Sequence, residues 1–271
     1  MLANIAENER VRGIIRSLGL RSHARKLYYR WKRPPDGILR TTAAGISARF
    51  NAGSYLELIH FSQSDGFRGE RDSLESFLSF IRKGDVVLDA GANYGLYTVY
   101  SAIAVGNHGK VISFEPGSRS FSSLLGNVVL NGVGNVHAFQ KALSDRDATE
   151  RLYMFGDDPS RCSMSDCKEY RVTRWEDIDA VEGDGFLRSN GLPWPNVVKI
   201  DVEGSEWAAL HGLQRTIAGP QCRLVFCEIH PHLLPKGVTP RDVVDFLESL
   251  GFGRTKDATR GREVHVFCQK L

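Results

Sequence analysis

The chain has 271 residues, of which 42% are hydrophobic and 25% are charged, so it is long enough for one large domain with a substantial core. This composition excludes an intrinsically disordered or fibrous protein, and no apolar stretch is continuous enough to span a membrane. The first thirty residues carry charges throughout and lack the apolar segment of a secretory signal, so we expect a cytoplasmic protein.

The formal net charge of +3 is distributed unevenly along the chain. Residues 1–40 contain ten Lys or Arg and three acidic residues, and their apolar residues recur at roughly helical spacing. This pattern predicts a basic helical extension that either packs on the main domain or makes peripheral contact with an anionic membrane surface. The run Pro34-Pro35-Asp36-Gly37 ends the helix. We therefore divide the chain into an extension, 1–40, and a domain, 41–271, and we expect no nucleic-acid partner.

Apolar runs of strand length alternate with helical patterns from residue 70 onward, which is typical of a parallel sheet covered by helices on both faces. Asp72 and Glu75 have the spacing of a capping box at the first helix. The final strands predict a hairpin, so the expected fold class is α/β, a doubly wound and mostly parallel sheet with an antiparallel end. The first predicted strand begins at residue 86, and the others are 110–114, 136–143, 197–201, 224–229, 252–256 and 263–269. The predicted helices are 72–81, 96–105, 120–130, 205–217 and 239–250.

Two shorter strands, 151–155 and 171–174, flank a polar stretch at 156–168. A connection of this length inside a compact domain is usually mobile or functional. We expect it to cover the ligand site when an acceptor binds.

The first candidate site is the run Asp89-Ala90-Gly91-Ala92-Asn93-Tyr94-Gly95, where the first strand of the sheet meets its helix. Ligands of open parallel sheets bind beyond the carboxyl ends of the strands, where glycines let the backbone approach them closely. Glu115 ends the next strand and is placed to accept both hydrogen bonds of a ribose diol. Together, the loop and the acid predict a nucleotide-like ligand.

Departures from a dinucleotide-binding loop indicate which ligand this is. In the pattern G-x-G-x-x-G, Asn93 replaces the second glycine, and Asp89 would repel a diphosphate but suits an ammonium group. S-adenosylmethionine has a ribose and an amino-acid end but no phosphate, so it fits best. A nicotinamide-dinucleotide-dependent oxidoreductase and a catalytically silent protein of the same fold that binds a partner are the alternatives.

The second candidate site follows another strand, at Asp201 and Glu203. Period-two geometry sends Lys199 and these two acids to one side while the chain stays extended. His230 ends the neighbouring strand and is expected to face the same cleft, where we assign it as the general base of methyl transfer. Asp201 and Glu203 would orient His230 or hold the ammonium of the cofactor. Glu206 is interpreted as a first-turn acid that the helix dipole favours.

We assign no metal ligands. A divalent ion on Asp201 and Glu203 is the less favoured alternative to the base, because the sequence offers no third ligand.

These motifs, taken together, resemble the FkbM-type family of S-adenosylmethionine-dependent methyltransferases. The resemblance rests on VVLDAGANYGLYT, GKVISFEPGS, NVHAFQKALSD, VTRWEDI, VVKIDVEGSEWAALHG and LVFCEIHP, which follow one another in this order between residues 84 and 232. It implies a Rossmann-like methyltransferase fold with strand order 3-2-1-4-5-7-6 and O-methylation of a hydroxyl on a natural product or glycan. The cofactor contacts that it implies are Asp89, Gly91, Asn93 and Gly95 for the methionine end, Glu115 for the ribose, and Lys141 and Ala142 for the adenine edge.

Overall fold

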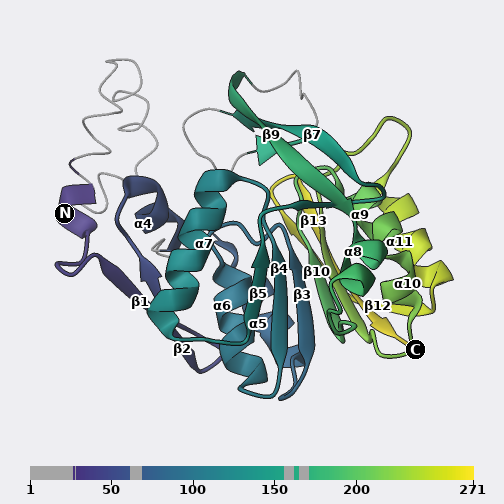
Figure 1. Ribbon diagram of the computed structural model, residues 1–271, viewed down its shortest axis with the longest axis horizontal. Helices are drawn as coiled ribbons and strands as arrows, with labels where there is room; N and C mark the ends of the chain where they lie inside the picture. The colour runs from purple at the N-terminus through teal and green to yellow at the C-terminus, as the bar shows by residue number, and fades with distance from the viewer. Residues whose placement is uncertain (1–26, 28, 62–68, 156–161, 165–170) are drawn as a thin grey trace.

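A seven-stranded sheet forms the centre of the protein (Figure 1). The computed structural model describes residues 27, 29–61, 69–155, 162–164 and 171–271. The strand order is β12-β13-β11-β10-β3-β4-β5, which confirms the predicted order, and the last two strands form the predicted antiparallel pair. The strands are β3 (Val86–Ala90), β4 (Lys110–Phe114), β5 (Val136–Phe139), β10 (Val197–Ile200), β11 (Leu224–Ile229), β12 (Phe252–Arg260) and β13 (Glu263–Lys270).

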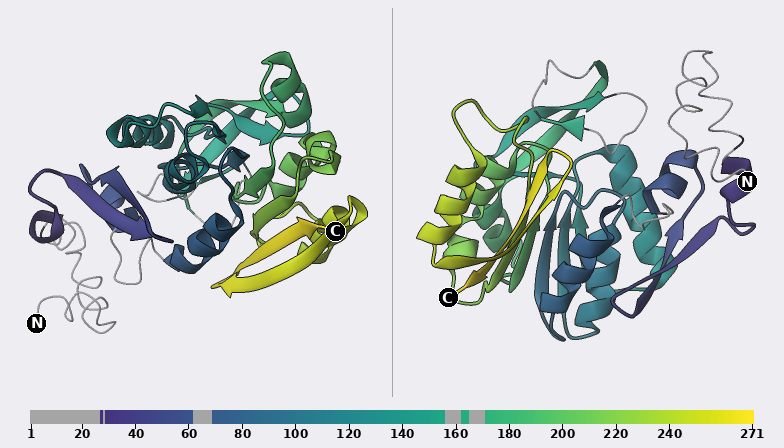
Figure 2. Two further views of the ribbon diagram at one scale, coloured as in Figure 1. Left: turned by 90° about the horizontal axis from the view of Figure 1, so that it is seen from below. Right: turned by 180° about the vertical axis from the view of Figure 1, so that it is seen from behind.

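Helices cover both faces of this sheet (Figure 2). One face packs against α5 (Arg71–Phe80), α6 (Leu96–Val105) and α7 (Ser118–Asn131). The other face packs against α8 (Gly183–Ser189), α9 (Glu206–Gly212), α10 (Gln214–Ala218) and α11 (Pro240–Ser249). Because strand side chains alternate between faces, Val87 belongs to the first core and Leu88 to the second.

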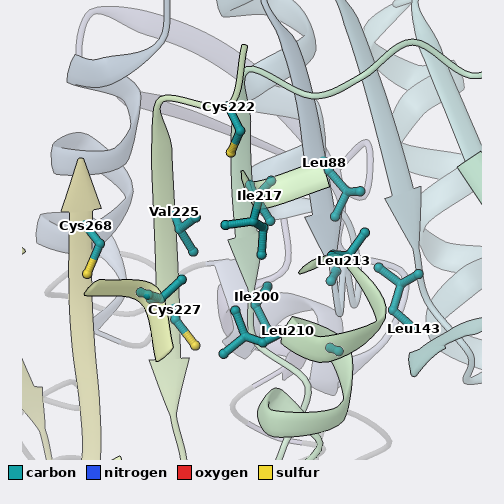
Figure 3. Close-up of a cluster of buried hydrophobic side chains, with 14 of the residues drawn as sticks. Leu88, Leu143, Ile200, Leu210, Leu213, Ile217, Cys222, Val225, Cys227 and Cys268 are labelled. Atoms are coloured by element: carbon teal, nitrogen blue, oxygen red, sulfur yellow. The ribbon is translucent and has the colours of Figure 1, made fainter. Parts of the chain in front are cut away.

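The second core is built from aliphatic side chains together with three buried cysteines (Figure 3). Cys222, Cys227 and Cys268 are each fully buried beside residues such as Val225 and Ile217. In this apolar setting the cysteines act as small hydrophobic side chains.

A smaller four-stranded sheet, which we call the accessory sheet, lies across one end of the main sheet at the top of Figure 1. Its order is β6-β9-β7-β8, with β6 (Ala142–Ser144), β7 (Ala148–Phe155), β8 (Cys162–Ser163) and β9 (Val172–Glu182). The two predicted short strands are therefore parts of longer ones in a separate sheet. The single strand predicted for 136–143 is wrong, because the chain leaves the main sheet after Phe139 and enters the accessory sheet at Ala142.

Several helix boundaries differ from the predicted ones. The helix predicted for 205–217 is interrupted at Leu213, which separates α9 from α10. The capping box is also wrong: α5 begins at Arg71, so Asp72 lies inside the helix, and Glu75 pairs with Arg71 at 2.9 Å.

A hairpin and a short helix near the N-terminus have no counterpart in the sequence analysis. They are β1 (Ile38–Ala43), β2 (Ile46–Asn51) and α4 (Tyr55–Phe61), and β2 packs against α6 and α7. Residues 29–32 are helical, whereas residues 1–26 of the predicted extension lie outside the described residues. The division into 1–40 and 41–271 stays a prediction, and β1 begins two residues before that boundary.

One buried ion pair joins the two strands at the centre of the main sheet. Lys199 of β10 stands opposite Asp89 of β3 in the parallel register, with Nζ 3.2 Å from Oδ1, and both residues are buried. Thr98 of α6 donates a hydrogen bond to the other oxygen of Asp89 at 2.6 Å. Removing one member of a buried pair leaves an uncompensated charge, which costs more free energy than losing the pair as a whole.

We therefore expect Lys199→Met to lower the free energy of unfolding by about 3 to 5 kcal/mol in urea denaturation, because Asp89 stays buried without its counter-charge. The matched control is the double variant Lys199→Met/Asp89→Asn, which removes both charges and should recover most of that loss. A double variant as unstable as Lys199→Met alone would show that packing, rather than charge, causes the loss.

Candidate active site

A cleft lies at the carboxyl ends of β3, β4 and β10 and is covered on one side by the accessory sheet. Its lining combines apolar side chains with a few polar groups, which is typical of a ligand-binding site. The residues that line it are Gly91, Asn93, Phe114, Glu115, Pro116, Ser120, Lys141, Ala142, Leu143, Leu152, Cys162, Ser163, Met164, Asp201, Val202, Glu203 and Ser205.

The glycine loop shapes the floor of this cleft. Gly91 has a φ of 77°, and a Cβ there would overlap the carbonyl oxygen of Asp201, so only glycine lets the two strand ends approach. Gly95 has a φ of 88° and packs closely on Leu124 of α7 rather than lining the cleft. The side-chain oxygen of Asn93 is buried and has no hydrogen-bond partner among the described residues, which leaves it as an acceptor for a ligand.

Glu115 directs a buried carboxylate at the cleft. The backbone N–H groups of Asn93 and Gly117 donate to its two oxygens at 2.8 and 2.9 Å, which fixes the orientation of the side chain. Burial raises the pKa of Glu115 to about 7, although these two hydrogen bonds and the positive charge of Lys199 oppose the rise. The nearby charge of Asp89 makes a smaller contribution to this rise.

Lys199 links the two candidate sites. Its Nζ donates to the carbonyl oxygen of Gly91 at 3.0 Å and lies 3.4 Å from a carboxylate oxygen of Asp201. Burial alone lowers the pKa of Lys199, but Asp89 and Asp201 raise it above its ordinary value, so the side chain stays charged. Because Asp89 is fully buried against Lys199 and Thr98, it does not line the cleft. Its predicted contact with the cofactor stays a prediction.

His230 lies behind the cleft, among carboxylates. Its Nδ1 is 2.8 Å from Glu206, its Nε2 is 3.5 Å from Glu203 and 4.0 Å from Asp201, and only 2% of the side chain is exposed. Burial lowers the pKa of His230, but the hydrogen bond with Glu206 and the charges of Glu203, Glu206 and Asp201 outweigh burial and raise it to about 11. The near-neutral titration expected of a general base is therefore not found.

The strand-end acids adopt a turn instead of the extended chain that the sequence predicts. Strand β10 ends at Ile200, and Glu203 has a left-handed backbone with a φ of 49°. This turn brings Asp201 and Glu203 together with His230, and ligand atoms of the three side chains lie within 4.8 Å of one another. A second cluster with the same spacing consists of Glu228, His230 and Glu263.

Most of the predicted site residues meet at the cleft. Asp89, Gly95 and His230 do not line it, whereas the others do, namely Gly91, Asn93, Glu115, Lys141, Ala142, Asp201 and Glu203. Two roles were not predicted from the sequence. Glu206 is a buried partner of His230 rather than a plain first-turn acid, and Lys199 is the cation that Asp89 and Asp201 share. The crowding of three acids into residues 201–206 was the available signal for Glu206.

The middle and C-terminal parts of the chain match a known family. The sequence model of the methyltransferase FkbM domain covers residues 89–253. The chain belongs to the FkbM methyltransferase family. The methyltransferases of this family depend on S-adenosylmethionine. Family membership therefore excludes the alternative of a nicotinamide-dinucleotide-dependent oxidoreductase.

Two relatives and one solved structure illustrate the similarity. The chain is 30% identical over 196 residues to the hexuronic acid methyltransferase AglP of Haloferax volcanii, covering 72% of this chain and 76% of AglP. It is 26% identical to the 31-O-demethyl-FK506 methyltransferase FkbM of Streptomyces tacrolimicus, covering 55% of this chain and 67% of that protein. The crystal structure of methyltransferase FkbM from Methylobacillus flagellatus KT aligns with a TM-score of 0.49 at 14% identity, covering 70% of this chain and 45% of that one.

Among the described residues, none of the helices is long and apolar enough to cross a membrane. Membrane contact through residues 1–40 and a cytoplasmic location stay predictions. Of the predicted cover at 156–168, the described residues Cys162, Ser163 and Met164 line the cleft, and the others lie outside the described part of the chain.

The pKa of Glu115 predicts how ligand binding depends on pH. The ionised carboxylate accepts hydrogen bonds from a ribose diol, and a carboxyl with a pKa of about 7 loses this form as the pH falls. We expect the affinity for 5′-methylthioadenosine, which carries the ribose but no amino-acid end, to fall about tenfold per pH unit below neutrality and to be constant above it.

Isothermal titration calorimetry from about pH 5.5 to about pH 8.5 measures this dependence. Glu115→Gln is the control, because it keeps the size of the side chain but cannot titrate, so its binding should be weak and independent of pH. Binding by the unmodified protein that does not change over this range would contradict the role of Glu115.

Proposed function

We propose that this protein is an S-adenosylmethionine-dependent O-methyltransferase whose acceptor is a hydroxyl of a glycan or a small natural product. The observation that carries the proposal is the cleft itself, because the glycine loop, the Glu115 carboxylate and the Asp201-Glu203 turn all line it. Membership of the FkbM family supports the transfer of a methyl group. O-methylation is the finer step, and it draws on the names of the two relatives at 26% and 30% identity.

The lining of the cleft fits the parts of S-adenosylmethionine. Glu115 would accept hydrogen bonds from the ribose hydroxyls, and the partnerless oxygen of Asn93 would accept one from the ammonium group. The apolar side chains of Leu143 and Leu152 line the cleft together with Ala142 and would contact the adenine ring. When bound, the cofactor supplies an electrophilic methyl group on its sulfonium sulfur.

The residues of the chain position the acceptor rather than provide a histidine base. Asp201 and Glu203 line the cleft and can accept a hydrogen bond from an acceptor hydroxyl, which orients its oxygen for an in-line approach. His230 is buried behind them with both ring nitrogens facing carboxylates, so at neutral pH it holds a proton instead of removing one. We therefore give His230 a positioning role and do not retain its assignment as the general base.

The acceptor class follows from what the relatives are named for. AglP is named for a hexuronic acid, and the Streptomyces protein is named for 31-O-demethyl-FK506. The second name specifies an oxygen that lacks its methyl group, which supports a hydroxyl acceptor here. A hexuronic acid also carries a carboxylate, whose methylation would give an ester. The test must therefore distinguish a methyl ester from a methyl ether.

The decisive experiment incubates the protein with S-adenosylmethionine labelled with ¹³C at the methyl group and a panel of acceptors. The panel contains an oligosaccharide ending in a hexuronic acid, its neutral counterpart, a macrolide with a free hydroxyl and an amino sugar. Carbon NMR separates methyl ethers, methyl esters and N-methyl groups. We expect a methyl ether; an ester would correct the acceptor group, and N-methylation alone would contradict O-methyl transfer.

Glu115→Ala should weaken S-adenosylmethionine binding by about 2 to 4 kcal/mol, because two charge-assisted hydrogen bonds are lost. The matched control is Glu248→Ala on the outer surface of α11, which also removes one carboxylate and should bind normally. Binding of the cofactor is measured by calorimetry, separately from turnover. No cofactor binding by the unmodified protein would support the catalytically silent alternative, and equal affinities for both variants would show that the ribose lies elsewhere.

A further inference from the structure

We propose that Asp201, Glu203 and His230 form a binding site for one divalent metal ion at the inner end of the cleft. From the sequence we assigned no metal ligands, because Asp201 and Glu203 lacked a third ligand. The fold supplies that partner from the neighbouring strand, since His230 directly follows β11. The proposal that an ion binds here does not depend on the proposed function. The catalytic role that we give the ion does rest on it.

The three ligand atoms have the spacing that a metal ion requires. The Nε2 of His230 lies 3.5 Å from Glu203 Oε2 and 4.0 Å from Asp201 Oδ1, and all three atoms fall within 4.8 Å of one another. Ligands bound at about 2.0 to 2.4 Å from an ion are separated by about 3 to 4.5 Å. The side chains can therefore converge on one ion without a change in the backbone.

A carboxylate behind the histidine holds its ring in the orientation of a metal ligand. Glu206 Oε1 lies 2.8 Å from His230 Nδ1, and the N–H of Gly204 donates to this same oxygen at 2.9 Å. Metal-bound histidines commonly direct their second nitrogen at a carboxylate in this way, which fixes the other nitrogen toward the ion. Here the arrangement directs Nε2 at Glu203 and Asp201.

Carboxyl groups are crowded around His230. Four of them, those of Asp201, Glu203, Glu206 and Glu228, lie within 4.0 Å of its ring nitrogens. Glu206 is fully buried, and its second oxygen has no hydrogen-bond partner among the described residues. Lys199 reaches Asp201 but is shared with Asp89. A divalent cation at this point would stabilise the ionised forms of Asp201 and Glu203.

The second cluster, Glu228, His230 and Glu263, competes for the same nitrogen, so only one of the two clusters can bind through His230. Glu228 is buried and lies 3.1 Å from His265, which already engages it. Asp201 and Glu203 line the cleft, where an ion keeps open positions for a substrate oxygen. This difference favours the first cluster.

The donor set indicates the kind of ion. Two carboxylates and one imidazole suit a first-row divalent ion such as Mn²⁺ better than Mg²⁺, which prefers oxygen ligands alone. An acceptor hydroxyl whose oxygen binds the ion would lose its proton to water, with the O–H electron pair left on oxygen. His230 would bind the ion through Nε2 as a neutral imidazole, so binding of the ion would release the proton that this nitrogen otherwise holds.

Mn²⁺ binding to the full chain tests the site without any turnover. Chelator-treated protein is titrated with Mn²⁺ at neutral pH, and electron paramagnetic resonance measures the free ion. We expect one equivalent to bind, and Glu203→Gln to weaken binding at least about 100-fold, beyond the 10- to 100-fold typical of residues behind the ligands. Glu263→Gln is the matched control and should change the affinity less than about threefold.

Three results would overturn the proposal: no stoichiometric binding by the unmodified protein, normal binding by Glu203→Gln, or loss of binding confined to Glu263→Gln. Glu203 is the most exposed of the ligands, at 37% of its side chain, so its variant should fold, and circular dichroism checks this.

Failure of the metal site can be distinguished from failure of the proposed function. Mn²⁺ binding without methyl transfer to any acceptor would support the metal site and reject the function. Full methyl transfer in the presence of a chelator, by protein that binds no Mn²⁺, would support the function and reject the metal site.

Discussion

The buried contact between Lys199 and Asp89 is the constraint on which the rest of the site depends. It joins the two central strands in register, and the same ammonium group holds the carbonyl oxygen of Gly91 and a carboxylate oxygen of Asp201. One side chain therefore ties the glycine loop to the acidic turn. A buried charge without a counter-charge costs free energy. The positions of these side chains are therefore set by their charged partners rather than by the secondary-structure propensity of the local sequence.

This constraint divides the cleft into two chemical halves. On one side of Gly91, Glu115 and Asn93 present hydrogen-bond acceptors suited to the polar groups of a nucleoside ligand. On the other side, Asp201 and Glu203 gather negative charge in front of a buried histidine. In the function that we propose, the first half binds the cofactor, and the second half orients and activates the acceptor hydroxyl. The accessory sheet closes the space between them with Leu152 and Cys162.

Features set by local patterns could be predicted from the sequence. The alternation of apolar runs gave the central strands and α6, and the position of Glu115 after a short apolar strand placed it at the cleft. Features set by distant contacts could not. The departure of the chain from the main sheet after Phe139, and the burial of Glu206 against His230, depend on neighbours far along the chain. A histidine at a strand end looks the same in sequence whether it faces solvent or four carboxylates.

We propose that one cleft holds the nucleoside at Glu115 and presents the sulfur end of the cofactor to the Asp201-Glu203 turn. A crystal structure of the full chain with S-adenosylhomocysteine would show both contacts at once. We expect the ribose hydroxyls within hydrogen-bond distance of Glu115 and the sulfur facing Asp201 and Glu203. A ligand with its ribose away from Glu115, or with its sulfur turned toward Lys141, would contradict it.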